Sequence, residues 1–128
     1  MHPPPELPPG LDPDACYLAL QAHRKAWCTR VQARIAGFDA LLSPTVPCVA
    51  PPLDPLRTDD ALFFDTNAAL LRHPSVVNFL DGCALTLPCQ APFSLPVGLM
   101  VWAGPLQDDT VLDLGLAIEA ALRPDGVA

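Results

Sequence analysis

The sequence predicts an α/β fold, and three observations support this class. One segment carries apolar residues at helical spacing: Leu20, Trp27, Val31 and Ile35. Two short apolar runs, 83–88 and 96–103, have the length of strands, and the second is apolar almost throughout, as in strands buried on both faces. Another helical segment follows them. Helices interspersed with a few strands indicate an α/β protein.

The chain opens with a proline-rich stretch at residues 1–11. Proline lacks the backbone N–H that regular structure uses, so we expect a flexible leader here and one domain over residues 12–128. Asp12 can cap a helix, with Pro13 at the first helical position, where the missing N–H costs nothing. This helix is expected to stop at Gly37.

The middle of the chain is divided by prolines. Residues 38–43 form a short apolar run that we interpret as a strand, and the proline-rich segment 44–55 predicts an extended loop. A helix is expected from Asp59 or Asp60 to about residue 71. Because a residue before proline avoids the helical region, His73-Pro74 should end that helix, and a separate short helix should cover 75–81.

Gly82 should turn the chain into the strand 83–88. The loop 89–95 contains potential turn residues, so we expect the strand 96–103 to lie antiparallel beside it. Asp108 or Asp109 should cap the last helix, which must stop before Pro124.

Composition excludes several classes of function. With 14 acidic against 7 basic side chains, the net charge of -7 disfavours binding to nucleic acid and to anionic membranes. The start of the chain lacks the features of a secretory signal, and no apolar run has the length of a membrane helix, so we expect a cytoplasmic protein. Five cysteines without a CxxC pair indicate reduced, mostly buried thiols.

Candidates for independent chemistry are few. The three histidines, His2, His23 and His73, lack ligand spacing, so we expect neither a metal nor another cofactor. Cys83 and Cys89 bracket a predicted strand, and a thiolate nucleophile there would need a base such as His73. The alternative, inert thiols, is the interpretation we favour.

The order of the motifs resembles the C-terminal end of amidase signature enzymes. Phe38-Asp39-Ala40-Leu41-Leu42-Ser43-Pro44-Thr45 is similar to that family's D-x-L-L-x-P-T strand. Residues 78–89, NFLDGCALTLPC, are similar to its N-x-x-G/D-x-x-A-x-x-x-P-C segment. The strand opening at 95–99, LPVGL, and the helix at 108–119 also match, so the resemblance covers about residues 12–123.

This resemblance implies an α/β fold that is the C-terminal piece of the amidase signature fold, a mixed β-sheet flanked by helices. Residues 12–128 would be a partial domain. The family hydrolyses amide C–N bonds with two serines, one of them in a cis peptide, and a lysine. Here the only serines are Ser43, Ser75 and Ser94, none adjacent to another, and the only lysine is Lys25. We therefore expect no catalytic residue in this chain.

The resemblance also implies a role and a partner. The chain is expected to supply scaffold and pocket wall to an amidase, as a C-terminal fragment or split subunit that is inactive alone. Asn78 is the candidate wall residue, because its amide could bond a substrate polar group, or alternatively a loop backbone. The expected partner is an N-terminal amidase half, or a second copy bound through exposed sheet, and a small amide would bind only to the complete enzyme. The alternative is a non-catalytic interaction or assembly module derived from an amidase.

Overall fold

The computed structural model describes Gly10 and residues 12–122. The predicted leader at residues 1–11 therefore lies outside the described residues, apart from Gly10. The chain divides into two compact units, residues 1–34 and 35–128, and each has its own architecture.

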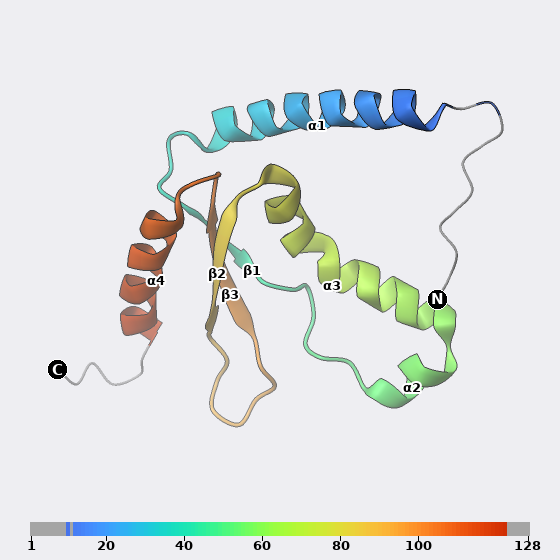
Figure 1. Ribbon diagram of the computed structural model, residues 1–128. Coiled ribbons are helices and arrows are strands. Elements are labelled where there is room, and N and C mark those ends of the chain that lie inside the picture. Colours follow the sequence, from blue (N-terminus) through green and yellow to red (C-terminus); the bar gives the residue numbers. More distant parts are fainter. Residues whose placement is uncertain (1–9, 11, 123–128) are drawn as a thin grey trace. The chain divides into compact units, whose positions relative to one another are not determined.

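Helix α1, Pro13–Ile35, makes up most of the described part of the first unit and contributes its last residue to the second (Figure 1). Its start agrees with the prediction. The Asp12 carboxylate accepts a hydrogen bond from the Asp14 amide at 3.1 Å, and the Asp12 carbonyl accepts one from the Cys16 amide at 3.0 Å. The Asp12 side chain thus bonds an amide that has no partner inside the helix, and the Asp12 carbonyl accepts the first backbone bond of the helix. The helix ends before Gly37, as expected.

The second unit is built on a three-stranded antiparallel sheet in the order β1-β3-β2. The strands are β1 Leu41–Pro44, β2 Cys83–Pro88 and β3 Gly98–Ala103. The central strand β3 pairs Val101 with Leu42 on one side and with Leu85 on the other. The predicted antiparallel pairing of residues 83–88 with 96–103 is therefore confirmed.

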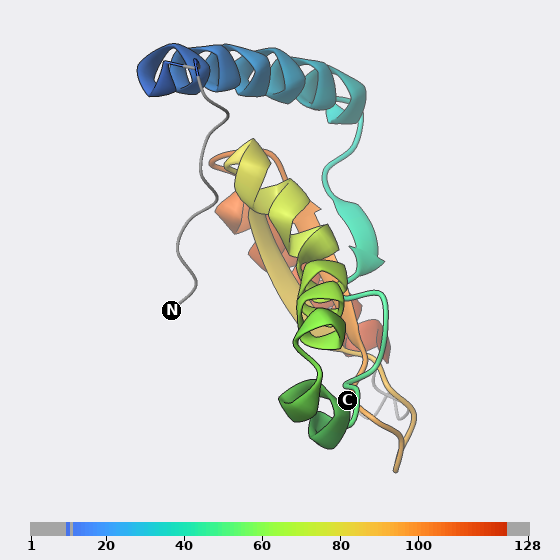
Figure 2. The same cartoon turned by 90° about the vertical axis from the view of Figure 1, so that its right-hand side faces the viewer.

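Helices α3 and α4 lie on opposite faces of this sheet (Figures 1 and 2). Helix α4, Asp108–Leu122, packs on β2 and β3, where Val111 joins a buried cluster with Leu87, Val101 and Ala103. The α/β class of the prediction is confirmed. Asp108 and Asp109, expected to cap α4, lie instead in its first turn, where a carboxylate still interacts favourably with the helix dipole.

Two glycines allow close approach in this unit. A Cβ on Gly115 of α4 would overlap the end of the Leu85 side chain on β2, so the glycine lets the helix lie directly on the strand. A Cβ on Gly82 would overlap the backbone carbonyl of Ala103. Gly82 follows Asp81, which ends α3 in the left-handed conformation with φ 57°.

The prediction of a helix break at Pro74 is wrong. Helix α3 runs without interruption over Asp60–Leu80, with Pro74 inside it. Proline removes only the bond to the carbonyl of residue 70, whereas the Asp59 cap and the burial of Val77 and Leu80 stabilise the helix on both sides of Pro74.

Two more expectations about the middle of the chain need correction. Helix α2, Leu53–Thr58, forms inside the segment expected to be an extended loop. Pro55 can be helical there because it lies in the first turn, where its missing N–H has no partner to lose. Strand β1 begins at Leu41 rather than Phe38 and includes Pro44, which is opposite Leu99 at a position that needs no N–H bond to β3.

Candidate functional site

The candidate wall residue Asn78 lies in the last turn of α3, near the point where the chain enters β2. It is exposed, and its backbone carbonyl accepts a hydrogen bond from the Asp81 amide at 3.2 Å. The side-chain amide is carried on a helix rather than a loop. Its predicted role as pocket wall remains a prediction.

Polar side chains gather on the sheet face opposite α4. Thr45, just after β1, and Thr86 of β2 are linked by a hydrogen bond of 3.1 Å between their Oγ1 atoms. Both side chains lie over Gly98 of β3, where a Cβ would approach Thr45 Oγ1 to 2.6 Å. The bond therefore spans the width of the sheet because β3 offers no side chain at this position.

His73 connects α3 to the end of β1. Its Nδ1 lies 2.8 Å from the backbone carbonyl of Pro44. A carbonyl only accepts, so Nδ1 carries the proton and donates it to this bond. The contact satisfies a carbonyl at the edge of the sheet and ties the helix to that edge.

Ser43 and Trp102 place two further polar atoms on the same face. Ser43 is opposite Met100, and Trp102 is opposite Leu41, so the two side chains are diagonal neighbours on one side of the sheet. Ser43 Oγ and Trp102 Nε1 are buried and have no hydrogen-bond partner. Such groups are rare in complete folds, because each costs about 1–3 kcal/mol.

Neither Ser43 nor Ser94 has the surroundings of an activated nucleophile. Ser43 Oγ bonds no base, and Ser94 Oγ donates to the Ala91 carbonyl at 2.7 Å. Lys25 belongs to the other unit of the chain. A Ser-Ser-Lys mechanism needs its groups within hydrogen-bond reach of one another, and neither Ser43 Oγ nor Ser94 Oγ is hydrogen-bonded to a second serine.

The thiol alternative finds no support in the geometry either. Cys89 Sγ donates to the Val97 carbonyl at 3.5 Å and Cys83 Sγ to the Gly104 carbonyl at 3.4 Å, whereas His73 Nδ1 is engaged by Pro44. The expectation of mostly buried thiols was wrong. Cys48 and Cys89 are exposed and the other three are half-buried, because the chain builds a small core on only part of its length.

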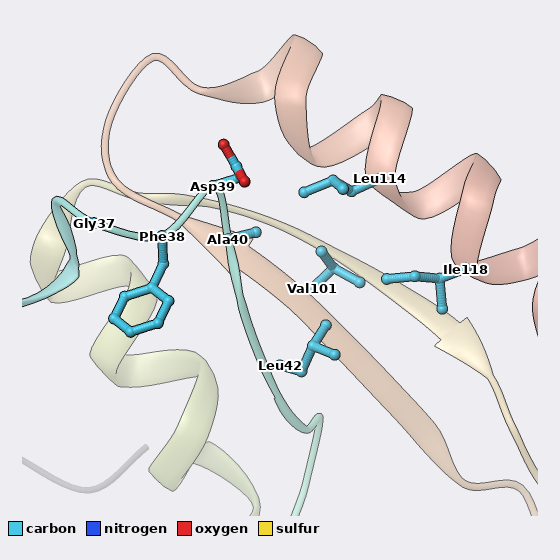
Figure 3. A pocket seen from close by; sticks show the side chains of 8 residues that line it. All are labelled: Gly37, Phe38, Asp39, Ala40, Leu42, Val101, Leu114 and Ile118. Carbon is cyan, nitrogen blue, oxygen red and sulfur yellow. The ribbon is translucent and has the colours of Figure 1, made fainter.

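A hollow of about 270 Å³ opens on the α4 face, beside β1 (Figure 3). Its walls are mainly apolar, with one carboxylate, that of Asp39. The residues that line it are Gly37, Phe38, Asp39, Ala40, Leu42, Val101, Leu114 and Ile118. In Figure 3, Leu42, Val101 and Ile118 point into the space between the sheet and α4, while Phe38 points away from it. No polar constellation for chemistry converges here.

Metal and membrane sites receive no support from the described part of the chain. No three His, Cys, Asp or Glu side chains among these residues gather as a metal site requires, and His2 lies outside the described residues. None of the helices within residues 12–122 combines the length and apolarity needed to cross a membrane.

The fold and the site together define an α/β segment whose described sheet has two open edges and a polar face with unsatisfied atoms. The sequence matches the family model described as Amidase over residues 10–112. The chain belongs to the amidase family, as the motifs at 38–45 and 78–89 predicted.

Curated relatives place this segment within much longer proteins. The chain is 38% identical over 112 residues to a glutamyl-tRNA(Gln) amidotransferase subunit from Acidothermus cellulolyticus, a match that covers 86% of this chain and 21% of the relative. It is 32% identical over 104 residues to 2-amino-5-chloromuconic acid deaminase from Comamonas testosteroni, covering 77% and 22%. The chain thus spans about a fifth of the length of these relatives. No solved structure gives a significant match.

Sequence reasoning singled out Asn78 but missed the polar face formed by Ser43, Thr45, Thr86 and Trp102. A signal was present, because Ser43 and Thr45 are two residues apart and alternate residues of a strand point to the same face. The pairing of Thr45 with Thr86 needed the strand order β1-β3-β2, which the sequence pattern does not encode.

Proposed function

We propose that this chain is the C-terminal portion of an amidase signature hydrolase, present as a fragment or split subunit, and that it supplies scaffold and pocket wall for hydrolysis of amide C–N bonds. The nucleophile, the second serine and the lysine reside on another stretch of polypeptide. Alone, the chain is inactive.

One observation carries this proposal. The chain belongs to the amidase family, yet it spans about a fifth of its relatives' length, and neither Ser43 Oγ nor Ser94 Oγ is hydrogen-bonded to a base. A family member without the reactive groups can take part in the family's chemistry only by completing a pocket that another segment equips. The similarity of its motifs to the C-terminal end of amidase signature enzymes supports the order of the two parts.

A polar residue at the end of α3 supports the same role. Asn78 is exposed at the end of α3 and can present its amide to a substrate carbonyl or amide group. The substrate class is a small amide, bound only by the completed enzyme.

The test is reconstitution. The partner is the Acidothermus cellulolyticus relative from which the segment that matches this chain has been removed, here called the truncated amidotransferase. The two polypeptides are co-expressed, and ammonia release from a set of simple primary amides is measured. We expect turnover from the complex and none from either polypeptide alone.

The alternative is a non-catalytic assembly module, and the open edges of the sheet are the feature that favours it. The same experiment separates the two functions. A stable complex that releases no ammonia from any amide would favour the module and contradict the hydrolase role.

A further inference from the structure

The two edges of the sheet differ in a way that assigns the attachment point of the missing part, and this inference rests on the proposed function. Both β1 and β2 pair only with β3 among the described strands. Each therefore has one side on which backbone groups can pair with a further strand. The surface next to each edge strand therefore decides which edge is the attachment point.

The register fixes which backbone groups of β1 point outward. The Thr45 amide donates to the Gly98 carbonyl at 2.9 Å, so Thr45 and Gly98 form a hydrogen-bonded pair. In an antiparallel ladder such pairs alternate with pairs that are not hydrogen-bonded, which makes the Leu42–Val101 pair one of the latter. The N–H and C=O of Leu42 therefore point away from β3.

Pro44 limits how far along β1 a further strand can pair. Pro44 also points outward, but it has no N–H, and its carbonyl is already bonded to His73 Nδ1. An added strand can thus pair with β1 at Leu42 and in the direction of Ala40, but not past Pro44. The stretch of β1 that is available for pairing therefore ends before Pro44.

The β2 edge is the other possibility. The Cys89 amide donates to the Val97 carbonyl at 2.9 Å, so by the same alternation Ala84 and Thr86 point their backbone groups outward. However, α4 and α3 both contact β2, and the side chain of Leu87 is only 7% exposed. Ala84 and Thr86 of β2 are nevertheless exposed, so the two edges differ chiefly in the hollow that lies beside β1.

The β1 edge has uncovered apolar surface with a hollow beside it. Leu42 is 59% exposed, and the hollow of about 270 Å³ lies next to it on the α4 face (Figure 3). Val101, Leu114 and Ile118 line its inner walls. A strand paired with Leu42 lies about 4.8 Å from β1, and a side chain on its α4 face therefore stands at the mouth of this hollow.

We propose that the outer edge of β1 is the site at which the missing part of the amidase adds a strand, with an apolar side chain of that strand seated in the hollow between β1 and α4. The occupant is an extended segment of the amidase polypeptide that this chain lacks. Its backbone bonds at Leu42 give affinity, and the apolar side chain gives the register.

The test uses the full 128-residue chain and the truncated amidotransferase. Leu42→Pro removes an outward N–H and the exposed side chain without removing a bond to β3, and Leu42→Lys places a charge at the mouth of the hollow. The controls are Ala84→Pro and Ala84→Lys, which remove an outward N–H of β2 and place a charge at the edge of β2, away from the hollow. Circular dichroism and amide NMR spectra verify that each variant keeps the fold.

The expected result is a dissociation constant raised by about tenfold to a hundredfold for both Leu42 variants, and little change for the Ala84 controls. Leu42→Pro loses a backbone bond to the added strand, whereas Leu42→Lys buries a charge where an apolar side chain should lie. Hydrogen exchange at the Leu42 amide of the wild-type chain should slow on binding, whereas exchange at Ala84 should not.

Three outcomes overturn the proposal. The first is a complex that still releases ammonia but in which the Leu42 variants bind with unchanged affinity, or only the Ala84 variants bind more weakly. This result leaves the proposed function intact. The second is protection of the Leu42 amide in a dimer of the chain alone, which makes a second copy the occupant. The third is the absence of any complex, which refutes both proposals. Loss of affinity at Leu42 in a complex without turnover supports the edge assignment and refutes only the hydrolase role.

Discussion

Thr45 and Thr86 share a hydrogen bond of 3.1 Å between their hydroxyl oxygens across the sheet, although they are 41 positions apart in the chain. The bond joins the end of β1 to β2 over Gly98, so it links both edge strands without passing through a side chain of β3. The energetic coupling between Thr45 and Thr86 therefore tests whether the polar face forms as described.

We therefore predict that Thr45→Val and Thr86→Val each lower the free energy of unfolding by about 0.5–1.5 kcal/mol, as expected for a net loss of one hydrogen bond. Because the two hydroxyls bond each other, the double variant should lose less than the sum of the single losses. Urea denaturation of the four proteins measures this coupling. Strictly additive losses would show that the bond does not form.

A second prediction concerns three glycines that differ in what surrounds them. Gly82→Ala should destabilise the protein most, because its Cβ meets the backbone carbonyl of Ala103, which cannot move aside. Gly115→Ala should cost less, because the end of the Leu85 side chain can rotate away. Both costs should fall near the range of about 1–3 kcal/mol that overpacking produces.

Gly104→Ala is the matched control for this series, since nothing lies within 4 Å of its added Cβ. Thermal unfolding should give the order Gly82→Ala, then Gly115→Ala, then Gly104→Ala, from most to least destabilised. A reversed order of Gly82 and Gly115 would contradict the close contact between the α3–β2 turn and Ala103.

Pro74 provides a third prediction. Its substitution by alanine restores a backbone N–H inside α3 and removes the ring clash with the preceding turn, so Pro74→Ala should stabilise the protein by about 1–3 kcal/mol. The urea midpoint reports the change. A decrease in stability would mean that packing of the half-buried ring outweighs the helix defect.

The sequence predicted most of the elements but not how they combine. Helical periodicity, the Asp12 cap and the apolar runs located α1, α4, β2 and β3, since these depend on local chemistry. The break predicted at Pro74 was wrong because tertiary burial of Val77 and Leu80 overrides a local preference. Likewise, the polar face depends on strand order, which is decided by contacts between residues far apart in the chain.

The fourth prediction concerns Asn78, the candidate wall residue that the motif alone suggested. In the reconstituted enzyme, Asn78→Ala should lower kcat/KM by about tenfold, the effect of losing one hydrogen bond to a substrate polar group, and leave assembly unchanged. Asn67→Ala is the matched control, because Asn67 is also an exposed asparagine of α3. Equal kinetics for both variants would remove Asn78 from the pocket.

The most direct test of the central claim is a titration in which the truncated amidotransferase is held constant and this chain is added, with ammonia release from a simple amide as the measured rate. The proposed role predicts no release by either polypeptide alone and a rate that rises to a plateau near equimolar chain. Release of ammonia at an enzymatic rate by the purified chain alone, increasing in proportion to its concentration, would contradict it.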